Sequence, residues 1–226
     1  FSMGQSHYQS DGFRENNDQE IDVYNLFGQV QVNPNISFQA EFQHMDEDEG
    51  DLSLRFNPEI FSPTFREEKR TEFLRGGLRH AFSPNSDILL SAIYQEKSID
   101  QHDIGNTDME GYGAEFQYLV HSKLLKIISG AGHFSTQETS EFPGTPILDS
   151  DFHHTNLYIY SLINYPNPVT WSLGASGDFV KGDGFDIHRE QFNPKIGVTW
   201  TPFIHTTLRG AAFRTLSRTL LNSQTV

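Results

Sequence analysis

The sequence has 226 residues, of which 36% are hydrophobic and 13% aromatic, with 19 phenylalanines. A soluble core of this size would draw more on leucine, isoleucine and valine. The formal net charge of −14 disfavours a nucleic-acid partner, because phosphate binding needs a concentrated basic surface. The absence of cysteine excludes a disulfide framework and a thiolate metal site.

The hydrophobic residues are spread along the chain rather than gathered into long runs. No stretch approaches the roughly 18 apolar residues that a membrane-spanning helix needs. A membrane-spanning strand needs only about 9–11 residues, and only one of its faces must be apolar. A chain with a mean hydropathy of −0.51 can therefore still cross a membrane as strands.

Alternation of apolar and polar residues is the main pattern of the sequence. In residues 36–43 every even position is apolar and every odd position is polar or charged. The same alternation returns over 112–120, 171–178 and 195–200. Because successive side chains of a strand point to opposite faces, each run predicts a strand with one apolar and one polar face.

Turn signals between these runs predict eleven strands. Their expected bounds, in chain order, are 2–9, 20–32, 36–45, 69–82, 87–98, 109–120, 124–137, 151–164, 170–181, 190–201 and 206–215. Several of these are longer than the usual five or six residues of soluble strands. Their length fits a tilted strand that crosses a bilayer and protrudes from it.

The connections between the predicted strands alternate in length. The short ones are rich in Pro, Asn and Ser, which favour tight turns, and comprise 33–35, 83–86, 121–123, 165–169 and 202–205. The longer polar ones comprise 10–19, 46–68, 99–108, 138–150 and 182–189, with the acidic cluster 46–51 expected as a solvated loop. Outer-membrane barrels have short periplasmic turns and longer external loops.

The expected fold is therefore all-β, an antiparallel up-and-down transmembrane β-barrel. Residues 1–226 form a single region of it, and about eleven strands make it part of a larger barrel whose plug and closing strands are absent. The leader that an outer-membrane protein requires is not seen at residues 1–5. The chain is accordingly expected to be mature or cut from a longer sequence.

Two sets of side chains are candidate functional positions in such a barrel. Charged residues on the polar faces are expected to line the lumen, where charges tune selectivity or pair with a plug: Arg75, Arg79, Glu41, Glu115, Asp178 and Lys195. Each also has a simpler interpretation, as a solvated side chain that pairs across strands. Aromatic residues near strand ends are expected at the membrane interfaces: Phe42, Tyr112, Tyr118, Trp171 and Trp200.

Catalytic and metal-binding patterns are absent from the sequence. The ten histidines show no ligand-like spacing, and adjacent residues such as His153 and His154 point to opposite faces of a strand. No Gly-x-Ser-x-Gly elbow occurs. The sequence therefore predicts no enzyme, no cofactor and no metal site.

The last forty residues resemble a known family. The stretches 192–202, with Pro194-Lys195-Ile196-Gly197, and 206–216, with Thr207-Leu208-Arg209 and Phe213-Arg214, are similar to the barrel strands of TonB-dependent receptors. The segments 51–56 and 79–84 resemble related barrels of outer-membrane proteins that carry tetratricopeptide repeats. The resemblance implies a 22-stranded barrel, a plug and energised uptake of siderophores, vitamins or glycans. Residues 1–226 are not expected to include that plug, a TonB-interacting segment or a terminal strand ending in an aromatic residue.

Three functions remain open at this point. The first is a receptor or transporter segment in the outer membrane of a Gram-negative bacterium, resembling TonB-dependent receptors in the uptake of a small ligand. The partners expected for it are outer-membrane lipid or lipopolysaccharide, a small-molecule ligand, and a periplasmic energising protein acting through the missing plug. The second is a passive porin or polymer-export barrel. The third is a soluble β-sandwich for binding or adhesion, in which the apolar faces pack on each other.

Overall fold

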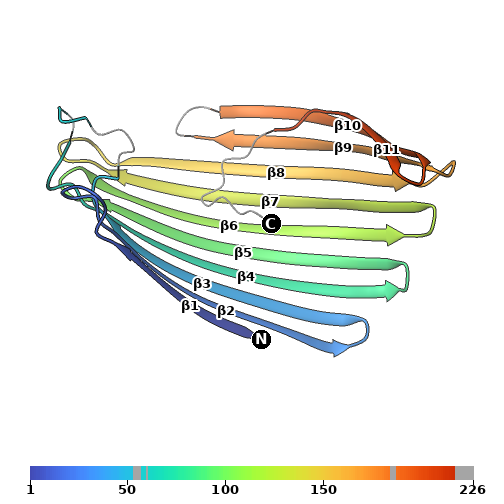
Figure 1. The fold of residues 1–226 in the computed structure, drawn as a ribbon, viewed down its shortest axis with the longest axis horizontal. Coiled ribbons are helices and arrows are strands. Elements are labelled where there is room, and N and C mark those ends of the chain that lie inside the picture. Colours follow the sequence, from blue (N-terminus) through green and yellow to red (C-terminus); the bar gives the residue numbers. More distant parts are fainter. Residues whose placement is uncertain (53–56, 60, 184–186, 217–226) are drawn as a thin grey trace.

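The protein is described by a computed structural model over residues 1–52, 57–59, 61–183 and 187–216. Eleven strands follow one another in a single sheet (Figure 1). Their bounds are β1 Ser2–Ser10, β2 Gln19–Asn33, β3 Ile36–Glu49, β4 Glu67–Ser83, β5 Ser86–Gln101, β6 Gly105–His121, β7 Leu125–Glu141, β8 Leu148–Ile163, β9 Val169–Gly182, β10 Ile187–Phe203 and β11 Thr206–Phe213. Each strand pairs antiparallel with its sequence neighbours, which confirms the all-β, up-and-down prediction.

None of the described residues forms a helix long and apolar enough to cross a membrane. The segment 51–56, used for the resemblance, lies partly outside the described residues, at positions 53–56. The predicted loops 46–68 and 182–189 also include residues outside the described part of the chain.

The short turns gather at one end of the sheet and the longer loops at the other (Figure 1). The connection between β5 and β6 is an exception at the loop end, because it comprises only residues 102–104 where 99–108 was predicted. The two strands continue to pair as far as Gln101 and Gly105, and Asp103 takes a positive φ of 66° in the turn. The predicted loop 99–108 is therefore mostly strand.

The acidic residues 46–49 were predicted as loop and instead lie in β3. Basic side chains of β4 compensate their charge. The Nζ atom of Lys69 lies 2.7 Å from a carboxylate oxygen of Glu49, and Nε of Arg70 lies 3.1 Å from one of Asp46. Because backbone pairing needs no apolar side chains, the strand continues where the alternation of the sequence ends.

The sheet has two chemically different faces. One row of directly opposed residues consists of Phe42, Leu74, Tyr94 and Tyr112, from β3 to β6. All four are exposed, and they belong to what we call the apolar face. The neighbouring row pairs Glu41 with Arg75 and belongs to the opposite side, called the polar face. The alternation read from the sequence is thus realised as two surfaces of one sheet.

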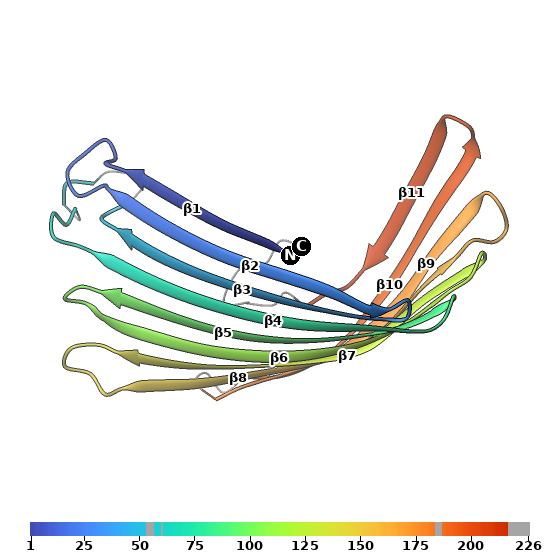
Figure 2. The same ribbon diagram turned by 90° about the horizontal axis from the view of Figure 1, so that it is seen from below.

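Burial differs between these faces in a direction opposite to that of a soluble protein. On the polar face of β9 and β10, Asp178 and Asn193 are 5% and 1% exposed. On the apolar face nearby, Leu157 and Phe192 are 51% and 63% exposed. The sheet is curved (Figure 2), and side chains inside a curve crowd together while those outside spread apart. This difference in burial assigns the polar face to the inside of the curve.

A hydrophobic core is nearly absent from the described residues, where Phe73 and Val180 are the buried hydrophobic residues. The described residues form one sheet, and no second layer covers its apolar face. A β-sandwich would pack such faces against each other at about 10 Å. The arrangement therefore disfavours the soluble sandwich and leaves a large exposed apolar surface.

Close packing on the polar face gives a testable difference between two glycines. A Cβ atom at Gly130, in β7, would lie 2.5 Å from the backbone oxygen of Phe116 and 2.6 Å from the Tyr158 ring. A Cβ atom at Gly76, on the apolar face of β4, would have nothing within 4 Å. We expect Gly130→Ala to lower the free energy of unfolding by about 1–3 kcal/mol through overpacking, and Gly76→Ala to leave it unchanged or raise it. Urea unfolding in lipid vesicles measures both, and equal effects would contradict the packing argument.

Candidate functional site: the polar face

The charged residues predicted on the polar faces of the strands are all found there, and each has a partner. Arg75 forms an ion pair with Glu41, the residue directly opposite on β3. Four residues further along β4, toward the short turn, a guanidinium nitrogen of Arg79 lies 2.6 Å from a carboxylate oxygen of Asp87 on β5. Both pairs link neighbouring strands, so these arginines bridge the sheet rather than extend freely from it.

Glu115 and Lys195 are connected through two tyrosines of β8. The Tyr158 hydroxyl donates a 2.5 Å hydrogen bond to Glu115, and the rings of Tyr158 and Tyr160 stack with centroids 5.4 Å apart. Lys195 donates to the Tyr160 hydroxyl at 3.0 Å, and its Nζ lies 4.7 Å from the centre of that ring. This chain of contacts runs from β6 to β10 across the polar face. The Glu115 carboxylate and the Lys195 ammonium thus each have a tyrosine hydroxyl as partner and do not contact each other.

Asp178 is the centre of a buried polar cluster. One of its carboxylate oxygens lies 2.7 Å from Nε2 of His154 and accepts a 2.7 Å hydrogen bond from Asn156. The other accepts a hydrogen bond from the side-chain amide of Asn193. All four residues are buried. A buried carboxylate is tolerated only when its oxygens are satisfied in this way.

Most partners in these groups were not predicted from the sequence, including Asp87, Tyr158, His154 and Asn193. Each partner lies on another strand than the charged residue it contacts, so the contact depends on the register between strands. The alternation within one strand does not give the register, but it does predict which residues share a face, because every second residue points to the same side. This alternation alone could have placed the even-numbered Tyr158 and His154 on the polar face of β8.

The five aromatic residues predicted near strand ends lie on the apolar face and are exposed: Phe42, Tyr112, Tyr118, Trp171 and Trp200. Phe42 and Tyr112 belong to the same row toward the loop end. Trp171 and Trp200 lie near the short turns of β9 and β10. The aromatic residues therefore mark both ends of the apolar surface.

A clamp of ion pairs joins the loops at the other end of the sheet. Arg66, which precedes β4, contacts Asp18 at 2.6 Å and also pairs with Asp48. The side-chain amide of Asn16 donates to the backbone oxygens of Ser62 and Phe65 at 2.9 and 2.8 Å. Hydrogen bonding to Arg66 lowers the pKa of Asp18, and the same bond raises the pKa of Arg66. The loops before β2 and β4 are thus held together.

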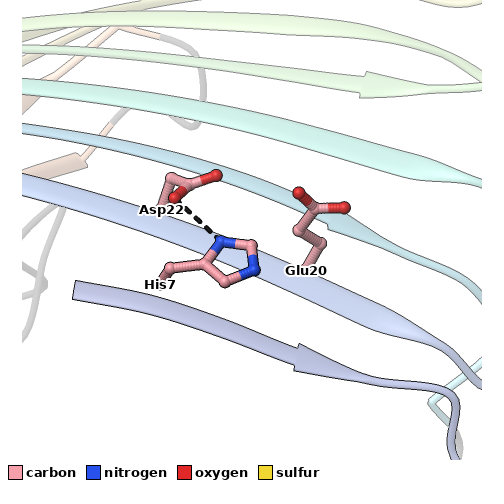
Figure 3. A group of neighbouring side chains, drawn as sticks. All are labelled: His7, Glu20 and Asp22. Atoms are coloured by element: carbon pink, nitrogen blue, oxygen red, sulfur yellow. Dashed lines mark hydrogen bonds and ion pairs between the residues drawn. The ribbon is translucent and has the colours of Figure 1, made fainter.

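One group of side chains on β1 and β2 has the residue types of a metal site (Figure 3). Nδ1 of His7 lies 3.0 Å from a carboxylate oxygen of Asp22, and potential ligand atoms of His7, Glu20 and Asp22 lie within 4.8 Å of one another. His7 and Glu20 are exposed, and the contact between His7 and Asp22 satisfies both groups without an ion. Sequence spacing missed the group because it spans two strands. The geometry could hold a divalent ion but does not require one.

The Asp178 cluster makes a prediction for stability. Replacing Asp178 by Ala removes the carboxylate that contacts three buried polar side chains, so we expect a loss of about 3–5 kcal/mol in the free energy of unfolding. Asp149→Ala is the matched control, because Asp149 is an exposed residue of β8 that accepts a single hydrogen bond from Thr139. Its loss should cost about 0–1 kcal/mol. Urea unfolding in lipid vesicles measures both, and similar losses would show that the cluster is not a stabilising unit.

The loop clamp makes a prediction for hydrogen exchange. The amides of Gly50 and Asp51 donate to the backbone oxygens of Asp18 and Asn16 at 3.0 and 2.7 Å. We expect Arg66→Ala to speed their exchange at neutral pH, while Arg66→Lys retains more protection because it keeps the charge.

Acid should have the same effect on the unaltered protein. The pKa of Asp18 is lowered from 3.8. The stability that ionised Asp18 gives to the loop clamp is therefore complete above pH 3.8, and it is lost as the pH falls through the lower pKa of the folded state. Protection of these amides should therefore be constant from pH 7 to 5 and fall only in stronger acid. A fall between pH 7 and 5 would assign the protection to another group.

Comparison with known proteins gives similarity in structure but not in sequence. No protein-family model matches the chain, and no curated protein matches it in sequence. Among solved structures, it is similar to the ferric preacinetobactin receptor BauA of Acinetobacter baumannii, with a TM-score of 0.78 and 8% identity over 91% of this chain. It is also similar to the ferripyoverdine receptor of the outer membrane of Pseudomonas aeruginosa, with a TM-score of 0.75 and 11% identity over 92% of this chain.

A third similar structure is the alcaligin outer-membrane receptor FauA of Bordetella pertussis, with a TM-score of 0.67 and 15% identity over 92% of this chain. The matches cover 41%, 37% and 37% of these three receptors, so the chain spans about two fifths of their length. At these identities the likeness shows the fold. The resemblance to TonB-dependent receptors is therefore confirmed at the level of the barrel wall: the chain has the fold of part of an outer-membrane receptor barrel.

Proposed function

We propose that this chain is a wall segment of a receptor or transporter barrel in the bacterial outer membrane, and that the whole protein takes up a small ligand. The observation that carries the proposal is the single curved sheet, with an exposed apolar face and a polar face that holds most of the buried side chains of β9 and β10. Such a surface is unfavourable in water, because exposed apolar area scales with free energy at about 25 cal/mol per Å². In a bilayer the same surface is solvated by lipid, and the backbone between neighbouring strands remains paired.

In this proposal the polar face lines the lumen. The residues concerned are Arg75, Arg79, Glu41, Glu115, Asp178 and Lys195, which lie inside the curve of the sheet. The ion pairs of Arg75 with Glu41 and of Arg79 with Asp87 keep opposite charges close together, and this limits the net field that a ligand meets beside them. The exposed aromatic residues at the two ends of the apolar face, Phe42, Tyr112, Tyr118, Trp171 and Trp200, lie in the membrane interfaces, where rings of this kind are favoured.

The partners follow from the same placement. The apolar face contacts outer-membrane lipid and lipopolysaccharide, and the lumen admits a small molecule. The solved receptors named above bind ferric preacinetobactin, ferripyoverdine and alcaligin, which supports a small ligand as the cargo. A periplasmic energising protein would act through a plug contributed by another part of the protein, because the resemblance is to energised receptors. We also propose that residues 1–226 form a single barrel region, because every described strand belongs to the same sheet.

Cysteine labelling in cells tests the membrane placement, since the chain has no cysteine of its own. We expect Asp11→Cys, in the loop between β1 and β2, to react with a membrane-impermeant maleimide in intact cells. Lys123→Cys, in the short turn between β6 and β7, should react only after the outer membrane is permeabilised. The two exposed positions serve as controls for each other. Labelling of both in intact cells, or recovery of the protein in the soluble fraction, would contradict the proposal.

Ion conductance of the whole protein in planar bilayers separates a receptor from a porin. A barrel closed by a plug should give little steady current, whereas an open porin or polymer-export barrel should conduct continuously. Continuous current with the expected cysteine labelling would retain the outer-membrane placement and replace the receptor by a passive pore.

A further inference from the structure

We propose that the polar face carries a binding site for a small organic anion near the short turns, at the opposite end from the long loops. The site is a cavity of about 860 Å³ formed by β6 to β11. This volume lies within the 300–1,000 Å³ range of small-molecule sites, which are mostly apolar with a few convergent polar groups. The inference rests on the proposed barrel function and names the class of ligand that the lumen would take.

The floor of the cavity consists of small residues. Ser172, Gly174, Gly197 and Ala211 are lining residues on β9, β10 and β11. Ser172 and Gly197 are directly opposed, as are Gly197 and Ala211. A row of such residues leaves space inside the curve that larger side chains would fill. The cavity therefore follows from the sequence of these strands rather than from a gap between separate elements.

The walls of the cavity are apolar where simple alternation would predict polar side chains. Ile128 and Leu162 belong to the polar face and line the cavity, although Ile127 and Ile163 beside them already supply the apolar face. Both lining residues are exposed, at 38% and 41%. Exposed apolar side chains inside a lumen cost free energy unless something covers them. An apolar body in the cavity would cover them.

The charged residues of the cavity are all basic. Lys126, Lys195 and Arg209 line it, and no Asp or Glu does so among the described residues, although the chain has 30 acidic against 16 basic residues. None of these three cations forms an ion pair within the described part of the chain; Lys195 contacts the neutral Tyr160. This contrasts with Arg75 and Arg79 on the same face, which are paired with carboxylates. Three cations beside an apolar surface are complementary to an anion with an apolar body.

Lysine footprinting of the whole protein in a non-ionic detergent tests the site, with 2-naphthoate as the probe. We expect 2-naphthoate to slow the acetylation of Lys126 and Lys195 in a saturable way. The exposed Lys123, in the adjacent turn and outside the cavity, should be unaffected. The uncharged 2-naphthamide should protect neither lysine at the same concentration. Equal protection by the amide would overturn the selectivity for anions.

Two variants and a matched control connect the protection with the cavity. Arg209→Ala should weaken the affinity for 2-naphthoate about tenfold through loss of one charged contact, and Arg209→Lys should restore most of it. Gly197→Phe should abolish protection, because a Cβ atom there meets only ordinary contacts at 3.5–3.6 Å and the ring would occupy the cavity. Gly76→Phe places the same ring on the apolar face and should leave protection unchanged. Unaltered binding by Gly197→Phe, with folding verified by circular dichroism, would overturn the proposed location.

Other occupants of the cavity give different outcomes. Protection of Lys126 and Lys195 without any probe would show that another segment of the protein fills the cavity, which would overturn a small-ligand site. If 2-naphthoate protects neither lysine while the cysteine labelling is as expected, this site is rejected and the barrel is retained. Failure of the cysteine labelling would reject the barrel itself, whatever the footprint.

Discussion

Continuous backbone pairing between neighbouring strands is the constraint on which the rest of the structure depends. With almost no hydrophobic core, the described residues are held together by ten antiparallel strand contacts in sequence order. In a bilayer, each unpaired backbone N–H or C=O would cost several kcal/mol. The pairing fixes the register, and the register then decides which side chains share a face and which meet across strands. The edges at β1 and β11 each lack one neighbour in the described sheet, which fits a segment of a larger barrel wall.

The polar face shows how charges are accommodated inside the curve. Asp178 keeps its carboxylate buried because His154, Asn156 and Asn193 surround it, whereas the more exposed Arg75 requires only Glu41. Such buried pairing adds little net stability compared with an apolar replacement, but removal of one partner is costly. The paired groups of the polar face therefore determine which side chains meet across the strands, and they add little to the free energy of unfolding. The cations near the short turns differ from this pattern because their counter-charges are absent from the described residues.

The sequence predicted the number, order and faces of the strands because these depend on local alternation. All six charged positions proposed from parity lie on the polar face, and the five aromatic residues lie on the apolar one. Alternation could not predict where strands end, as residues 46–49 and 99–108 show, because pairing continues through polar residues. Nor could it predict the Tyr158–Glu115 bond, the Asp178 cluster or the His7–Asp22 contact, since each joins residues 15 to 43 positions apart through the register. The cavity left a weak signal in the sequence, the successive apolar residues Ile127-Ile128 and Leu162-Ile163.

The loop end of the sheet requires its own explanation, because the register there opposes like charges. Glu20, Asp48, Glu68 and Asp100 form one row across β2 to β5. Like charges directly opposite each other destabilise strand pairing. On the same face Arg66 pairs with Asp18 and Asp48, and Arg70 pairs with Asp46, which reduces the repulsion. On the opposite face Lys69 pairs with Glu49 and Glu67, which are directly opposed in the adjacent row. The strands extend beyond the apolar face because these contacts offset the repulsion, and the same Arg66 joins the strand extension to the loops that precede β2 and β4.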